Sequence, residues 1–248
     1  MKKLLAFLAV IVLFAFSVAS ASAATHGPRI ILKNGTSTNW SGYASVLGSL
    51  TNPTINTVTD VRGTWTVQPV DCSLAATNTY SSAWVGIDGY TSNSVEQLGT
   101  EHDCISGQPQ YYAWYEMYPK PGYRITKLSV QPGDVMTGEV RYSGGKFVLS
   151  LMSSRGAFTT TQRSNKAVRS SAEWIVEAPW SGGVLPLANF GTLPFSSSSA
   201  TINGVPGAIN AFTYDKIDMA NASNVLKDQT SDLSSGGTAF SVIWKSSN

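Results

Sequence analysis

The sequence predicts an all-β protein of the two-sheet sandwich type. From residue 39 onward, short runs rich in β-branched and aromatic residues alternate with Gly, Pro, Asn and Ser turns. No stretch shows the apolar period of a helix, and so many short strands are typical of a sandwich. About 225 residues remain after an N-terminal signal, which suits one large β domain with a sizeable core.

The first residues resemble a secretory signal. Two lysines precede an apolar run from Leu4 to Val18, and the small residues Ala21-Ser22-Ala23 follow as a cleavage site. A membrane anchor is the alternative, but about fifteen apolar residues are short for a hydrocarbon core of ~30 Å. We therefore expect residues 1–23 to be a cleaved signal peptide, residues 24–38 a short leader or pro-segment, and residues 39–248 a single domain. The protein is predicted to be secreted and extracellular.

Charge gives no sign of a polyanionic partner. The formal net charge of +2 falls to zero once Lys2 and Lys3 are removed, and only 13% of the residues are charged. Nucleic acid and anionic membranes are bound through clustered positive charge. We expect neither as a partner, and we expect a monomer.

The cysteines and histidines are few. Cys72 and Cys104 are the two cysteines, and in an oxidising compartment they predict one disulfide. The two histidines, His26 and His102, form no metal-binding motif, so no zinc or other cofactor is expected. A Ser-His-Asp triad would rest on His102 alone, and no G-x-S-x-G elbow is present.

The expected strands follow in chain order, and the Ser196–Ser199 run is expected to be a loop. They are Trp40–Val46, Asp60–Val67, Ser82–Asp88, Val95–Gly99, Gln110–Tyr118, Lys127–Val130, Val135–Tyr142, Lys146–Ser153, Ala172–Glu177, Ala200–Ile202, Phe212–Met219 and Ala239–Trp244.

Three of these strands have one apolar face and one face that mixes acids with large apolar groups, since alternate residues face opposite sides. The apolar faces carry Val85 and Ile87; Ala113, Tyr115 and Met117; and Trp174 and Val176. The mixed faces carry Trp84, Gly86 and Asp88; Trp114, Glu116 and Tyr118; and Glu173, Ile175 and Glu177.

The mixed faces are either a solvated sheet surface or the floor of a cleft. An unpaired buried carboxylate is costly, so they cannot be ordinary core. Clustered aromatics favour a cleft. Glycoside hydrolysis needs two carboxyl groups at most about 9.5 Å apart. Glu173 and Glu177 are about 13 Å apart along one strand, but Glu116 with Glu177 leaves a glycosidase possible.

The same segments resemble the glutamic peptidases, the eqolisins or G1 family. The matching pieces are Asn39-Trp40-Ser41-Gly42-Tyr43, Ser82-Ala83-Trp84-Val85-Gly86-Ile87-Asp88-Gly89, Glu96-Gln97-Leu98-Gly99, Ala113-Trp114-Tyr115-Glu116-Met117-Tyr118-Pro119 and Ala172-Glu173-Trp174-Ile175-Val176-Glu177, with a weaker match at Asp232–Phe240. The resemblance implies a lectin-like, concanavalin-type sandwich of two curved antiparallel sheets with the active site on the concave face.

The resemblance also implies residue roles. The catalytic glutamine falls on Gln97 and the catalytic glutamate on Glu177, with Glu173 as the alternative base. Cleft-lining residues fall on Trp84, Asp88, Trp114, Glu116 and Tyr118. The implied activity is acid-active endopeptidase action on polypeptide substrates, without metal or covalent intermediate. A carbohydrate-binding lectin-like module or a glycosidase on the same fold remains the alternative.

Overall fold

The computed structural model describes residues 24–33, 35–73 and 77–248. Within these ranges the chain forms nineteen strands and two 3₁₀ turns, η1 (Ile209–Ala211) and η2 (Ser235–Gly237). The strands are β1 (Ile31–Lys33), β2 (Thr36–Ser37), β3 (Trp40–Val46), β4 (Gly48–Ser49), β5 (Asn52–Pro53), β6 (Val58–Thr66), β7 (Ser82–Ile87), β8 (Val95–Ile105), β9 (Gln108–Tyr118), β10 (Tyr123–Ile125), β11 (Val135–Ser143), β12 (Lys146–Ser153), β13 (Gly156–Gln162), β14 (Ser171–Glu177), β15 (Thr192–Ile202), β16 (Val205–Ala208), β17 (Thr213–Ala220), β18 (Leu226–Thr230) and β19 (Phe240–Trp244).

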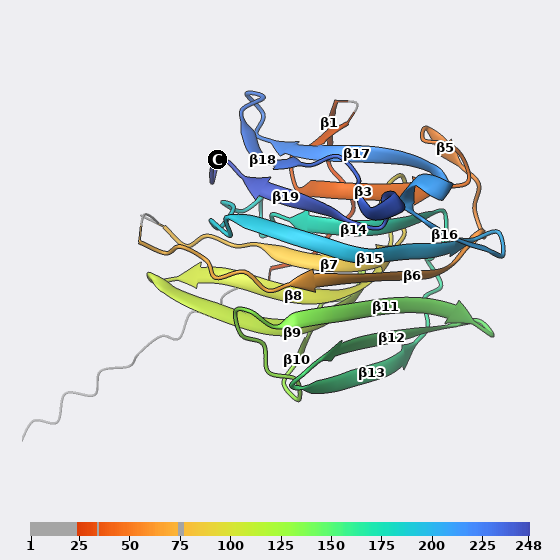
Figure 1. Ribbon diagram of the computed structural model, residues 1–248, viewed down its shortest axis with the longest axis horizontal. Coiled ribbons are helices and arrows are strands. Elements are labelled where there is room, and N and C mark those ends of the chain that lie inside the picture. The colour runs from red at the N-terminus through yellow and green to blue at the C-terminus, as the bar shows by residue number, and fades with distance from the viewer. Residues whose placement is uncertain (1–23, 34, 74–76) are drawn as a thin grey trace, which may run out of the picture.

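The strands form two layers, as the sequence predicts. The first, the site layer, has the order β10-β9-β8-β7-β14-β3-β17. The second layer has the order β13-β12-β11-β6-β15-β19-β18. Neighbours within each layer are antiparallel, and β17 also pairs with β18, so seventeen strands share one hydrogen-bonded network. Figure 1 shows these strands running across the molecule, with β13 at one edge and β17 and β18 at the other.

The core confirms the alternation of faces. Val85 and Ile87, together with Trp174 and Val176, are buried in the large apolar cluster between the layers. Trp84 belongs to a second cluster on the outer face of the site layer. That cluster also contains Trp40, Trp114, Ile175 and Ile217. The outer face of the site layer is therefore buried as well, and so are its acids Glu116, Glu173 and Glu177.

Some expected elements differ from the structure. The strand expected at Lys127–Val130 is wrong, because these residues form a turn and a loop, and the nearest strand is β10. Leu128 and Val130 are buried, but from a loop, so alternating burial imitated a strand. The loop expected at Ser196–Ser199 is also wrong, because the run lies inside β15 with a bulge against β6. Strand β13 was missed, since its Thr-rich sequence lies exposed at a layer edge.

The disulfide and the absence of a membrane-spanning helix among the described residues also relate to the sequence predictions. Cys72 and Cys104 form the expected disulfide. The expected signal peptide lies outside the described residues. In the described part of the chain, no helix is long and apolar enough to cross a membrane.

Candidate active site

The candidate site lies where β7, β8 and β14 run side by side in the site layer. Gln97 on β8 pairs with Gly86 on β7, and Glu173 on β14 pairs with the same Gly86 from the other side. Glu177 lies four residues further along β14, opposite Ser82. The strand register therefore places Glu173, not Glu177, in the same row as Gln97. The side-chain contacts instead bring Glu177 and Gln97 to the same residue.

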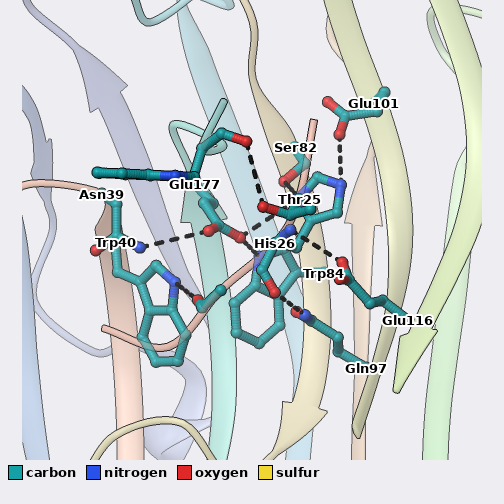
Figure 2. Close-up of polar contacts among 12 residues, drawn as sticks. Thr25, His26, Asn39, Trp40, Ser82, Trp84, Gln97, Glu101, Glu116 and Glu177 are labelled. Carbon is teal, nitrogen blue, oxygen red and sulfur yellow. Dashed lines mark hydrogen bonds and ion pairs between the residues drawn. The ribbon is translucent and has the colours of Figure 1, made fainter. Parts of the chain in front are cut away.

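The contacts of Gln97 and Glu177 converge on one residue, His26 (Figure 2). The Gln97 side-chain amide donates a hydrogen bond to the His26 carbonyl. Glu177 Oε2 lies 3.5 Å from Nδ1 of the His26 ring. Glu173 instead has Asp88 and Glu96 as its neighbouring charges. The structure thus brings the two predicted catalytic side chains together around a peptide group of the chain itself.

Glu177 is held by one side chain of β7 and by one from the residue directly before β3. Trp84 Nε1 donates to Glu177 Oε2 at 2.9 Å, and Asn39 Nδ2 donates to Oε1 at 3.4 Å. Trp84 also packs edge-on against Trp40, with ring centroids 4.9 Å apart. The carboxylate therefore has a fixed orientation on the outer face, as expected of a group whose rotamer must be set before chemistry.

Residues 25–30 cross this face as an extended peptide. Thr25 exchanges two backbone hydrogen bonds with Trp180, at 2.9 Å each. The Gly27 carbonyl accepts from Trp40 Nε1 at 3.1 Å, and the Pro28 carbonyl accepts from Asn39 Nδ2 at 3.1 Å. The segment expected to be a leader thus packs on the domain as a bound peptide would. Its backbone groups form hydrogen bonds with Asn39, with Trp40 of β3 and with Trp180 in the loop after β14.

His26 occupies the centre of the site. Its ring stacks on Trp114 with centroids 3.7 Å apart, and its Nε2 lies 2.8 Å from Glu101 Oε1. Its backbone N–H donates to Glu116 Oε2 at 2.9 Å. Ser82 Oγ lies 3.3 Å from Nδ1. His26 is only 4% exposed, so one residue fills the space between the acids.

Burial sets the electrostatics of the cluster. Burial raises the pKa of Glu177, although the neighbouring His26 and the Trp84 hydrogen bond oppose that rise. Burial likewise raises the pKa of Glu116 to about 7, against the opposing charge of His26. Burial alone would lower the pKa of His26, but Glu101 and Glu177 raise it well above its ordinary value. The imidazolium therefore stabilises the charged forms of Glu177 and Glu116.

Several polar atoms of this cluster lack a hydrogen-bond partner. Among the described residues, the buried atoms without one include Gln97 Oε1, Glu116 Oε1, Trp114 Nε1 and both carboxylate oxygens of Glu101, of which Oε1 forms the ion pair with His26. Buried polar groups are nearly always satisfied, and exceptions concentrate at sites that bind something else. All of these atoms belong to side chains that contact His26, which indicates a site built for more than packing.

The predicted cleft-lining residues fall into two groups. Trp84, Trp114 and Glu116 contact Glu177 or His26 as described above. Tyr118 lies beside the segment, because a Cβ added to Gly27 would meet its ring at 3.7 Å. Asp88 points elsewhere: its carboxylate accepts backbone N–H groups of residues 168, 169 and 170 at 2.7–2.8 Å. The geometry gives Asp88 the role of anchoring this loop.

Sequence reasoning missed four residues of the site: His26, Asn39, Ser82 and Glu101. Glu101 has the same parity as Gln97 on β8, and extending that strand beyond Gly99 would have revealed it. The strand expected at Val95–Gly99 is too short, because Glu101, His102 and Asp103 are polar and yet are buried within β8. His102 faces the core between the layers, where burial lowers its pKa to about 3.

The fold matches that of solved peptidases. Scytalido-glutamic peptidase with a transition-state analogue inhibitor has a TM-score of 0.70 at 21% identity, over 84% of this chain and 98% of that chain. Aspergilloglutamic peptidase from Aspergillus niger has a TM-score of 0.59 at 27% identity, over 67% of this chain and 99% of that chain. The fold is thus the β-sandwich of glutamic peptidases.

Sequence comparison makes the assignment specific. Aspergillopepsin-2 of Aspergillus niger is 30% identical over 206 residues, which are 71% of this chain and 70% of that protein. The model of the Peptidase A4 family matches residues 38–242. This chain belongs to the Peptidase A4 family, the glutamic peptidases, and is a peptide-bond hydrolase whose substrates are polypeptides. The expected resemblance and fold class are confirmed.

Proposed function

We propose that the protein is exported as an acid-active endopeptidase and that Gln97 and Glu177 are its catalytic pair. In this proposal residues 1–23 are the signal peptide, residues 24–38 a leader, and residues 39–248 the catalytic domain, which acts as a monomer. The family supports peptide hydrolysis in general, and the oxidised Cys72–Cys104 pair fits an extracellular compartment.

One observation carries the assignment of the pair: a peptide carbonyl of the chain accepts a hydrogen bond from Gln97 while Glu177 lies against the same residue. An amide that already donates to a peptide carbonyl is in position to donate to the oxyanion that forms from such a carbonyl. The peptide runs extended across the outer face, as a polypeptide substrate would.

The proposed mechanism needs no covalent intermediate and no metal. Ionised Glu177 takes a proton from a water molecule, whose oxygen attacks the carbonyl carbon. Gln97 donates to the oxyanion of the tetrahedral intermediate. The C–N bond then breaks as Glu177 returns the proton to the leaving nitrogen. Glutamine thereby replaces the neutral carboxyl of an aspartic dyad, in which two acids share one proton.

Two ionisations would shape the pH dependence. Protonation of Glu116, whose pKa burial raises to about 7, removes a negative charge beside Glu177 and favours activity below neutral pH. Glu177 must itself stay ionised to act as a base, so activity falls again at lower pH. We assign this role to Glu116, because the Asp88 carboxylate accepts backbone N–H groups of residues 168 and 170.

The rivals on the same fold are a glycosidase and a sugar-binding module with Trp84, Trp114 and Tyr118 as platforms. Trp84 donates to Glu177 and Trp114 stacks on a peptide side chain, so neither indole is free as an exposed sugar platform in this structure. A glycosidase would use two acids and leave Gln97 dispensable.

The test uses three alanine variants of the secreted protein, assayed on a denatured protein substrate from pH 2 to 8. We expect Gln97→Ala and Glu177→Ala to fold but lose nearly all activity, with at least about 10²–10³ of the rate lost for the oxyanion donor. Glu173→Ala is the matched control, because Glu173 lies across from Gln97 in the strand register. Full activity in either of the first two variants would overturn the assignment.

A further inference from the structure

The imidazole of His26 sits in a subsite with complementary groups on every side. We call this the imidazole subsite and define it by Trp114, Glu101, Ser82 and Glu177. Trp114 stacks on the ring, and Glu101 pairs with Nε2 at 2.8 Å. Ser82 lies 3.3 Å and Glu177 3.5 Å from Nδ1. Glu101 and Glu177 are almost fully buried, at 1% and 0% exposure. The floor is a flat aromatic ring, and both ends carry carboxylates.

The hydrogen bond to Gln97 fixes where this subsite lies along a substrate. Because Gln97 holds the carbonyl of His26, the bond presented to the pair is the one between His26 and Gly27. His26 is therefore on the acyl side of that bond, and its side chain fills the pocket immediately before the point of cleavage. Gly27 follows on the amine side, beside Tyr118.

The chemistry of the subsite discriminates among side chains. A protonated imidazole matches the flat floor and places its positive charge 2.8 Å from Glu101 and 3.5 Å from Glu177. A phenyl ring would stack equally well on Trp114 but would leave Glu101 buried without a partner, which is costly. An acidic side chain would face Glu101 and Glu177 as a like charge.

We propose that the imidazole subsite selects histidine immediately before the cleaved bond, with Glu101 and Trp114 as the specificity-determining residues. This inference rests on the proposed function, since it names the side chain that the same site takes on the acyl side. In this structure the chain itself fills the subsite, with His26 of residues 24–29.

The experiment measures binding separately from cleavage. In the full chain carrying His26→Ala, so that the internal imidazole is absent, the peptides Ala-Thr-X-Gly-Pro-Arg with X = His, Phe or Gln are compared at pH 5 by thermal shift. The same peptides then compete with a casein-derived reporter, and products are identified by mass spectrometry. We expect the His peptide to bind at least about tenfold more tightly than the Phe peptide, the lower end of a charge-assisted hydrogen bond.

A second pair of variants tests the specificity residues. Adding Glu101→Gln should abolish most of the preference for His over Phe, while adding Glu173→Gln should keep it. Equal binding of the His and Phe peptides by the Glu101-intact chain overturns the inference even if the reporter is cleaved. A clear His preference without any cleavage keeps the subsite and overturns the proposed function instead. If Glu101→Gln does not fold, the three peptides on the Glu101-intact chain decide the question alone.

Discussion

The hydrogen bond from Trp84 to Glu177 makes the role of the glutamate testable without removing it. The substitution Trp84→Phe keeps an aromatic ring in the outer-face cluster but removes the indole N–H that donates to Glu177 Oε2 at 2.9 Å. That donor stabilises the ionised carboxylate, so its loss raises the pKa of Glu177 further. Because the proposed base must be ionised, activity should be lost first on the acid side.

The size of the effect follows from the bond. A hydrogen bond to a charged group contributes about 1.5–3 kcal/mol, and 1.36 kcal/mol corresponds to one pKa unit. We therefore expect the acid limb of the kcat profile to move upward by about one to two pH units in Trp84→Phe. The plateau above that limb should change much less. The assay is kcat against pH for a fluorogenic peptide, read from pH 2 to 7.

Trp40→Phe is the matched control. Trp40 is fully buried in the same cluster and stacks edge-on against Trp84, but its indole N–H donates to the Gly27 carbonyl, not to Glu177. It loses a comparable core volume and should leave the acid limb in place. An unmoved acid limb in Trp84→Phe, or an equal movement in both variants, would refute the role of Glu177 as the titrating base.

Two further predictions concern residues 24–30 and the buried acids. His26→Ala removes the stacking on Trp114 and the pairing with Glu101, so residues 24–30 should compete less with substrate. We expect the apparent KM of the full chain to fall by about tenfold or more at unchanged kcat. An unchanged KM in steady-state assays would contradict this. Burial raises the pKa of Asp228 to about 8. The folded chain therefore keeps the Asp228 proton at pH values where the unfolded chain has already released it. The stability that this proton contributes is lost as the pH rises toward 8. In Asp228→Asn, the free energy of unfolding should therefore fall less steeply between pH 5 and 7, by about 1.4 kcal/mol per pH unit, when measured by denaturant titration. An equal dependence of unfolding free energy on pH in the variant and the parent protein would show that Asp228 is ionised when folded.

The alternation of faces was predictable because it depends on local geometry. In β7 and β14, one residue in two is apolar, and the period of a strand assigns Val85 and Trp174 to the core without any tertiary information. The acids on the opposite faces were identified as incompatible with ordinary core for the same reason. What parity cannot supply is the distance between residues on different strands.

The choice between Glu173 and Glu177 shows where that limit lies. Both have the same parity on β14, and the register places Glu173 nearer to the row of Gln97. Only the long-range contacts of Glu177, to Trp84, Asn39 and His26, separate the two. For His26 the sequence gives no such signal, because nothing in its neighbouring residues indicates that it folds back onto a strand more than fifty residues away.

The buried acids avoid the cost of an unpaired charge in three different ways, one of which depends on residues 24–30. Glu96 and Asp103 avoid the cost of a buried charge because burial raises the pKa of each to about 9, so they are neutral at neutral pH. Asp88 stays satisfied by three backbone N–H groups. Glu101 and Glu177 instead share the imidazolium of His26. If residues 24–30 leave, these two carboxylates lose their ion-pair partner, and water must take its place, since a buried charge without a partner is costly. Departure of residues 24–30 should therefore admit water beside Glu177, the reactant that the proposed hydrolysis requires.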